Sequence, residues 1–312
     1  MKRKIKPGDT YQTKRFGVVE VVKYHNSKSI DVLFLNTNTP STVRADHLRS
    51  GLIKDPSLRI PKDMQPGSKH QTNNYGMVEV VSQSGCNDVV VRFVDTGYTC
   101  SVAYDNLIRG KVKDKLSPSV HGVGFPGAGD YSPSINNDAY GRWCDMLERC
   151  YSKNQDEYHP TYSECTVCEE WHNFQNFAKW YYKNHPMDGR KYAIDKDLKV
   201  LGNKLYSPDM CLFVSQSVNN FLCDSRANRG STMIGVSYFK RDGNYEGYCN
   251  NPFTGKKDRI GYYSTELEAH MAWRRAKSVM AERLASEQCN DEVKNGLIRY
   301  KLAIDNNEVQ AY

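Results

Sequence analysis

The sequence lacks any long apolar run. No stretch approaches the roughly 18 consecutive apolar residues that a membrane-spanning helix needs, and the basic start MKRKIKPGDTYQ has no apolar segment behind it. We therefore expect no membrane partner and no secretory signal. Ten cysteines in a chain that is not secreted favour buried thiols or metal ligands over disulfides.

Charge of one sign is in only modest excess. The 312 residues carry a formal net charge of +7, with 39% hydrophobic and 25% charged residues. A chain of this size and composition should fold into about two or three domains, each with a sizeable core. The excess of positive charge permits a polyanionic partner without requiring one.

The N-terminal third contains a duplicated module. Lys6–Asp55 aligns with Pro66–Asp114 without a gap, and the matched residues all differ by 59 positions. The pairs include Gly8 and Gly67, Thr13 and Thr72, Phe34 and Phe93, and Asp55 and Asp114. Each copy contains short β-rich runs, which predict two small β-barrel-like repeats at residues 1–60 and 61–116. Such modules bind nucleic acid, a protein partner or another copy, or serve as spacers.

A Gly/Pro-rich segment, residues 117–137, follows the repeats. Gly122, Gly124 and Gly127 spell GxGxxG, but Pro126 interrupts the motif and further turn residues follow it. A dinucleotide site needs a strand before this motif and a helix after it. We therefore interpret the segment as a connector rich in turns.

Two core helices are predicted at the start of the next domain, residues 138–228. Asn137 or Asp138 can cap the first helix, and apolar residues recur at helical spacing in both. The expected buried faces are Trp143, Met146, Leu147 and Cys150 in the first helix, and Trp171, Phe174, Phe177 and Trp180 or Tyr181 in the second.

The cysteines of this domain allow two interpretations. Cys165 and Cys168 have the spacing of half a zinc site, and Cys150 and Cys211 could complete it, with Cys144, His159 and His172 also near in sequence. The sequence has no second closely spaced cysteine pair here, so buried thiols are the alternative.

Acidic and amide side chains follow a short predicted strand, Tyr192–Ile194. Asp195 and Asp197 are two residues apart and would share one face of an extended segment. Together with Asn219 or Asn220 they could hold Mg²⁺ or Mn²⁺, which activates water and stabilises a leaving phosphate. The alternative is a polar turn in which Asp195 pairs with Lys196 or Arg190.

The layout of this domain resembles phage-encoded HNH-type endonucleases, including homing endonucleases. The landmarks are RW..M..RCY, VC.EW..F..F..W, IDKD and GN..YSP..C.FV, which together cover roughly Tyr140–Leu222. The resemblance implies a ββα-metal fold, one divalent ion and phosphodiester cleavage. Lys196 stands where the family has its general-base histidine, and Met210 replaces an asparagine. Either Asp197, His159 or His185 serves as the base, or the domain only binds DNA.

The last domain, residues 229–312, is predicted as three strands packed on a helix. The strands are Ile234–Lys240, Tyr245–Asn250 and Lys257–Tyr263, joined by turns at Asp242-Gly243 and Thr254-Gly255. Thr265 and Glu268 form a capping box for the helix, whose expected apolar face is Leu267, Met271, Ala272, Ala276 and Met280. An amphipathic helix over Asp291–Ile304 should pack back on the domain.

One face of this sheet should stay open, and its cations and aromatic side chains suit double-stranded DNA. The candidates are Arg241, Tyr245, Lys256, Lys257, Arg259 and Tyr262. A sheet can enter the major groove, where such side chains meet phosphates and base edges. A solvated basic face is the alternative interpretation.

This segment is similar to the Apetala-type (ethylene-response-factor) DNA-binding domain. The matching residues are Gly235-Val236, Tyr245, Gly255-Lys256, Ile260–Tyr263, Thr265, Glu268-Ala269 and Ala272-Trp273. Phage HNH-type endonucleases often carry this domain at their C-terminus, so the two resemblances imply one architecture.

The predicted fold class is therefore a multidomain α+β protein. We expect a phage-encoded, DNA-binding, metal-dependent endonuclease in the host cytoplasm or the virion. One alternative is a catalytically degenerate descendant reused to bind nucleic acid or to build the virion. Another is a protein–protein adaptor whose repeats dominate.

Overall fold

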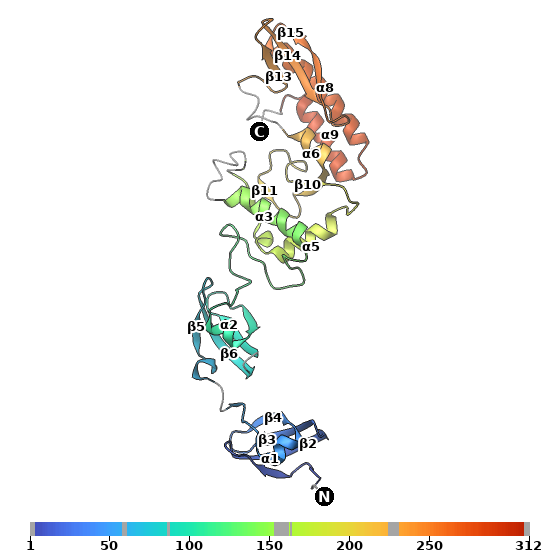
Figure 1. Ribbon diagram of the computed structural model, residues 1–312. Helices are drawn as coiled ribbons and strands as arrows, with labels where there is room; N and C mark the ends of the chain where they lie inside the picture. The colour runs from blue at the N-terminus through green and yellow to red at the C-terminus, as the bar shows by residue number, and fades with distance from the viewer. Residues whose placement is uncertain are drawn as a thin grey trace. The chain divides into compact units, whose positions relative to one another are not determined.

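The chain has a mixed α+β architecture built from small, mainly antiparallel sheets (Figure 1). The computed structural model describes residues 4–57, 61–85, 88–152, 162, 164–223 and 231–308. The chain divides into two compact units, residues 1–115 and 116–312. In the described ranges, none of the helices combines the length and apolar character that crossing a membrane requires.

Each N-terminal repeat folds as a four-stranded antiparallel meander. The first copy contains β1 (Thr10–Gln12), β2 (Val18–Asn26), β3 (Ser29–Phe34), β4 (Thr39–Val43) and α1 (Ala45–Ser50). The second contains the 3-10 helix η2 (Lys62–Met64), β5 (Lys69–Gln71), β6 (Met77–Gly85), β7 (Asp88–Phe93), β8 (Thr99–Val102) and α2 (Tyr104–Ile108).

Neither repeat closes into a barrel within its described residues. A barrel requires the first and last strands to pair, but β1 pairs only with β2, and β4 only with β3. These outer strands have just three and five residues, so they are too short to wrap around the core. The predicted β-barrel-like repeats are therefore open sheets.

Strand register confirms the duplication. Val19 pairs with Phe34 in the first sheet, and Val78 pairs with Phe93 at the matching positions of the second. The register shifts after Val21 in one sheet and after Val80 in the other. Matching residues therefore build matching cores.

Each repeat also fixes its last segment with a buried carboxylate. Asp55 is fully buried, and the Thr37 hydroxyl donates a hydrogen bond to it. In the second copy, Thr96 Oγ1 donates to Asp114 Oδ2 at 2.6 Å. Because a buried carboxylate is costly without such a partner, this bond holds the segment after the short helix against the turn after the third strand.

Two helices and a 3-10 turn build the aromatic core of the second unit. They are α3 (Asn137–Tyr151), η4 (Glu169–His172) and α5 (Phe174–Asn184). The predicted face of α3 is confirmed, because Trp143, Met146, Leu147 and Cys150 are all buried. Trp171 precedes α5 instead of lying in it, and its carbonyl oxygen accepts a hydrogen bond from Trp143 Nε1 at 2.6 Å.

The predicted connector packs onto this core. Gln175 Nε2 donates to the carbonyl oxygens of Pro126 and Tyr131, both at 2.8 Å. A Cβ at Gly124 would lie 2.4 Å from the Leu147 side chain, so only glycine fits this close approach. The segment before α3 is therefore an integral part of the second unit.

Two small sheets follow α5. In the first, β10 (Tyr192–Asp195) pairs antiparallel with β12 (Leu212–Ser215), and the predicted strand at Tyr192 is confirmed. In the second, β9 (Thr166–Val167) pairs parallel with β11 (Leu205–Tyr206). The helix α6 (Gln216–Leu222) starts directly after β12, where the Ser215 hydroxyl caps it by accepting from Val218 N.

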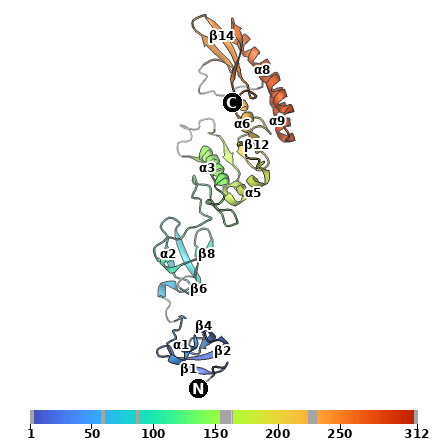
Figure 2. The same ribbon diagram turned by 45° about the vertical axis from the view of Figure 1, so that its right-hand side comes forward.

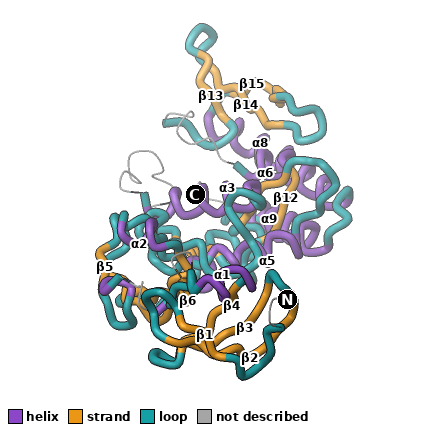
Figure 3. The backbone as a smooth tube through the Cα atoms, turned by 60° about the horizontal axis from the view of Figure 1, so that its bottom comes forward, coloured by secondary structure: helices purple, strands orange, loops and turns teal. Residues whose placement is uncertain are grey.

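The C-terminal segment contains the predicted three antiparallel strands and two helices. These are β13 (Val236–Phe239), β14 (Asn244–Asn250), β15 (Lys257–Tyr263), α8 (Glu266–Ser286) and α9 (Asp291–Asp305). Figure 3 shows the three strands side by side beside α8, and Figure 2 shows α8 next to α9. The capping box of Thr265 and Glu268 is confirmed.

The expected apolar face of α8 is wrong in part. Leu267 is 59% exposed and Met271 37% exposed, whereas Ala269 and Trp273 are buried. The reason is that α8 packs against the sheet with one side and against α9 with another, so its buried surface is wider than a single stripe.

One hydrophobic core joins the central and C-terminal segments. Leu198, Leu212 and Val214 of the central segment pack with side chains of α8 and α9, which include Ala281, Leu284, Val293, Leu297 and Ile304. Lys277 of α8 is buried with them and donates to the Phe221 carbonyl oxygen at the end of α6. The two predicted domains thus share their interior.

Candidate functional site: a pocket at Asp195 and the open face of a sheet

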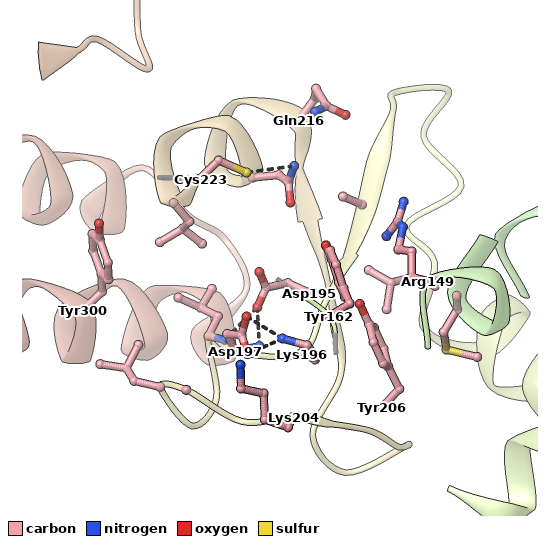
Figure 4. Close-up of a pocket in the computed structure, with 18 of the residues that line it drawn as sticks. Arg149, Tyr162, Asp195, Lys196, Asp197, Lys204, Tyr206, Gln216, Cys223 and Tyr300 are labelled. Atoms are coloured by element: carbon pink, nitrogen blue, oxygen red, sulfur yellow. Dashed lines mark hydrogen bonds and ion pairs between the residues drawn. The ribbon is translucent and has the colours of Figure 1, made fainter. Parts of the chain in front are cut away.

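A cavity of about 860 Å³ opens beside the turn that follows β10 (Figure 4). Its walls come from α3, β10, β11, α6, α9 and the segments between them, and include Arg142, Arg149, Tyr162, Asp195, Lys196, Asp197, Lys204, Tyr206, Asn219 and Tyr300. Asp195, Asp197 and Asn219, three of the four predicted catalytic residues, therefore line one pocket. Asn220 does not line it; this side chain accepts from Gln216 Nε2 at 2.8 Å.

The Asp195 carboxylate is held by its own turn. Its Oδ1 accepts the backbone N–H groups of Asp197 at 2.9 Å and Leu198 at 2.7 Å. Burial raises the pKa of Asp195 above its ordinary value, although these two hydrogen bonds oppose the rise. The predicted alternative pairing of Asp195 with Lys196 or Arg190 is not the observed one.

Lys196 binds Asp197 instead. Its Nζ donates to Asp197 Oδ1 at 2.7 Å and to Oδ2 at 2.8 Å, and the lysine side chain is only 9% exposed. Burial disfavours the charged form, but the bound carboxylate outweighs it, so the pKa of Lys196 lies above its ordinary value. A lysine in this state is an ammonium ion and does not serve as a general base.

Aromatic rings and further cations surround this ion pair. Lys196 Nζ lies 5.8 Å from the ring centroids of both Tyr162 and Tyr206. Arg149 approaches the Tyr162 ring at 5.7 Å, and Lys204 lines the same cavity. These residues come from segments far apart along the chain. The landmarks RCY and YSP include Arg149 and Tyr206, but the sequence does not show that either residue belongs to the site.

His185, one of the histidines offered as alternative bases, does not meet Asp195. His185 stacks on Tyr181, with ring centroids 5.0 Å apart, and lies 4.9 Å from the Phe213 ring. Burial lowers the pKa of His185, and the side chain is not part of the pocket wall. His159 lies outside the described residues.

The residues present do not fit either predicted metal. Within the part of the chain that the structure describes, no three or more His, Cys, Asp or Glu side chains are grouped so as to hold an ion. Cys150, Cys165, Cys168 and Cys211 are free thiols. Burial raises the pKa of all four, to about 12 for Cys150 and Cys211. At the acidic turn, both oxygens of Asp197 already bind Lys196.

The second candidate site is the sheet face that points away from α8. Gly247 and Cys249 of β14 face the helix, since a Cβ at Gly247 would meet Ala269 and Cys249 Sγ lies 3.7 Å from Met280 Sδ. The alternating residues of β14 and their partners on β15 therefore share the opposite face. These residues are Glu246, Tyr248, Lys257, Arg259 and Tyr262.

Cations on this open face stack on aromatic rings. Lys257 Nζ lies 3.2 Å from the centroid of the Tyr248 ring, and the Arg259 guanidinium lies 5.3 Å from that of Tyr262. Tyr262 remains 46% exposed. Arg259 also forms an ion pair with Glu246, which holds its side chain across the strands. Tyr248 was missed by the sequence prediction, although its alternation with Gly247 and Cys249 marks it as a residue of the open face.

The other predicted DNA contacts lie at different places. Arg241 follows β13, stacks 5.4 Å from the Phe239 ring and pairs with Asp242 at 2.9 Å. Lys256 is exposed in the turn before β15. Tyr245 lies two residues before Gly247, so it belongs to the face that carries α8, next to Tyr238.

No protein-family model matches the chain, and no curated protein or solved structure matches it. The functional proposal therefore rests on the pocket and on the open face of the sheet.

Proposed function

We propose that this protein binds double-stranded DNA through the open face of β13, β14 and β15. The observation that carries the proposal is the pair of stacked cations, Lys257 on Tyr248 and Arg259 on Tyr262. Stacking holds each cation at the surface in a defined place, where it can meet a phosphate or a base edge. A three-stranded sheet is also narrow enough to enter the major groove.

The central segment is proposed to derive from an HNH-type nuclease that no longer cleaves. The order β10, β12, α6 is the order of elements in a ββα-metal fold, which supports this origin. Lys196 supports the loss of cleavage, because it is charged and binds the carboxylate that a metal would need. In this proposal the protein is phage-encoded, acts in the host cytoplasm or the virion, and uses its repeats to contact a protein partner or a second copy.

DNA binding is tested by fluorescence anisotropy with a duplex of random sequence over a series of salt concentrations. Lys257→Gln and Arg259→Gln should each weaken binding and lower the slope of log K against log salt by about 1 for each phosphate that is no longer neutralised. Lys294→Gln, which removes the same charge from the exposed side of α9, is the matched control and should leave the slope unchanged. If all three changes weakened binding equally, DNA affinity would depend only on the net charge of the protein. That result would refute the sheet face as the DNA-binding surface.

A second candidate function is metal-dependent cleavage of DNA. The observation in its favour is that Asp195, Asp197 and Asn219 line one pocket. Its test is nicking of a supercoiled plasmid with Mg²⁺ or Mn²⁺, compared with Asp195→Ala. Nicking that disappears in the variant would support this candidate over the degenerate one; absence of nicking with either metal would exclude it.

A further inference from the structure

The pocket at Asp195 already contains a positive charge at the place where the resemblance implies a metal ion. A divalent ion at this acidic turn would need free oxygens on Asp195 and Asp197. Asp195 Oδ1 instead accepts two backbone N–H groups, and both oxygens of Asp197 accept from Lys196 Nζ. Three of the four carboxylate oxygens are therefore committed to donors of the protein itself.

The lysine has little room to leave. Its side chain is 9% exposed, and its Nζ lies 5.8 Å from the ring centroids of both Tyr162 and Tyr206. Separating the ammonium from Asp197 would leave a charge unpaired in this enclosed position, which is strongly unfavourable. The ion pair is therefore a fixed part of the pocket.

We propose that the Lys196 ammonium is the resident cation of this centre, so that the pocket holds a phosphate group without a divalent metal. An ammonium has three N–H donors, and the two bonds to Asp197 leave one for a ligand. Arg142, Arg149 and Lys204 line the same cavity, where they offset the negative charges of Asp145, Asp195 and Glu308, which line it too. The identity of the phosphate as part of a DNA backbone rests on the proposed function, whereas the exclusion of the metal does not.

The first experiment measures Mn²⁺ binding to the full-length protein, without DNA, by electron paramagnetic resonance. The wild type should not bind Mn²⁺ at this centre at concentrations up to the order of 1 mM. Lys196→Gln frees Asp197 and should tighten Mn²⁺ binding at least about tenfold, because a positive charge next to the ion is removed. The double change Lys196→Gln with Asp197→Asn should abolish that gain.

Two outcomes would overturn the metal-free centre. One is a wild type that binds Mn²⁺ as tightly as Lys196→Gln; the other is a loss of Mn²⁺ binding when Asp197→Asn alone is made. If Lys196→Gln does not fold, the wild-type protein alone can test the proposal by NMR. Added Mn²⁺ should leave the Asp197 and Leu198 amide signals sharp, and broadening of these signals would contradict the proposal.

The second experiment titrates inorganic phosphate into the protein in the presence of EDTA. The amide signals around Lys196 should shift with saturation, and Arg149→Gln should weaken this binding about tenfold because it removes a charge-assisted hydrogen bond. Lys294→Gln, outside the pocket, should not. Signals that do not respond to phosphate would refute the anion site. Neither Mn²⁺ nor inorganic phosphate tests DNA binding. The pocket proposal can therefore be refuted while the sheet still binds DNA, and DNA binding by the sheet can be refuted while the pocket proposal stands.

Discussion

At the residue scale, the position that the HNH resemblance assigns to a histidine is the most informative. The Lys196 ammonium donates hydrogen bonds to both carboxylate oxygens of Asp197, while Asp195 Oδ1 accepts hydrogen bonds from two backbone N–H groups of its own turn. The result is a cluster in which three of the four carboxylate oxygens accept hydrogen bonds from the protein itself. A neutral histidine in the same place would not bring a positive charge to Asp197, so one side chain sets the charge of this turn.

The buried thiols predict a loss of stability at alkaline pH. Burial raises the pKa of Cys150 and Cys211 from 9.0 to about 12, so both stay protonated in the folded protein when the unfolded chain ionises. Their contribution is complete below about pH 9 and declines as the pH rises towards 12. Each thiol should therefore cost about 1 kcal/mol of unfolding free energy by about pH 10.

Urea denaturation followed by tryptophan fluorescence at pH 8 and pH 10 measures this effect. The double variant Cys150→Ala with Cys211→Ala should lose less stability between the two values than the wild type does. The same decline in both proteins would contradict the assignment of the effect to these thiols.

The threonine that contacts each buried carboxylate gives a second prediction at this scale. Thr37→Val removes the hydroxyl that donates to Asp55, which is fully buried, so the first repeat should lose about 1–3 kcal/mol. Hydrogen exchange of the β3 amides in the full-length protein reports this destabilisation.

All four tryptophans lie beyond residue 115, so tryptophan fluorescence follows the second unit and provides an internal control. Its denaturation midpoint should not change in Thr37→Val. Unaltered exchange in β3 would show that the Thr37 bond is dispensable.

The sequence predicts Asp195, Asp197 and Asn219 as neighbours, and the pocket brings them together. Spacing and resemblance were sufficient there because two of the residues are nearly adjacent. The meeting of Arg149, Tyr162 and Tyr206 could not be predicted, since it depends on how α3, β11 and the segment that carries Tyr162 come together at one pocket. Tyr245 was wrongly expected on the open face, because the sequence alone does not show that Gly247 and Cys249 of the same strand are buried against the helix.

At the element scale, the contact between β13 and α8 depends on a glycine. Gly235 has φ of 76°, and a Cβ there would lie 2.1 Å from the Trp273 ring. Gly235→Ala should therefore cost about 1–2 kcal/mol for the left-handed backbone and about 1–3 kcal/mol more for the steric clash. Gly243→Ala is the matched control, since its φ is 68° but its Cβ would meet nothing within 4 Å.

Thermal denaturation of both variants separates the two contributions. Gly235→Ala should melt at a clearly lower temperature than Gly243→Ala, and the summed tryptophan emission, to which Trp273 contributes, should change only in the former. Equal melting temperatures would mean that the sheet can move away from the helix without cost.

Elements with a local signal were predicted well. The apolar spacing of α3, the capping box of α8 and the three C-terminal strands all lie close to their predicted places. The side of α8 that is buried was harder to predict, because its partners include α9 and the sheet at once, and the sequence of one helix does not show how many elements surround it.

At the scale of the whole molecule, the shared core makes a prediction about truncation. Removing α8 and α9 would expose Leu198, Leu212 and Val214, each worth about 1.5–3 kcal/mol when buried. A chain ending at residue 223 should therefore unfold at a lower urea concentration, as followed by the fluorescence of Trp143, Trp171 and Trp180, than a chain starting at residue 116. Equal denaturation midpoints for the two chains would contradict this expectation.

The shared core also bears on inheritance. A sheet that reads DNA is useful as a cassette only if it can be cut out and joined to another protein, and here its helices supply the interior of their neighbour. The sheet and the pocket should therefore pass together through recombination, because a crossover between them would expose the core that they share. The duplicated repeats, with a complete core in each copy, carry no such constraint and can be gained, lost or exchanged singly.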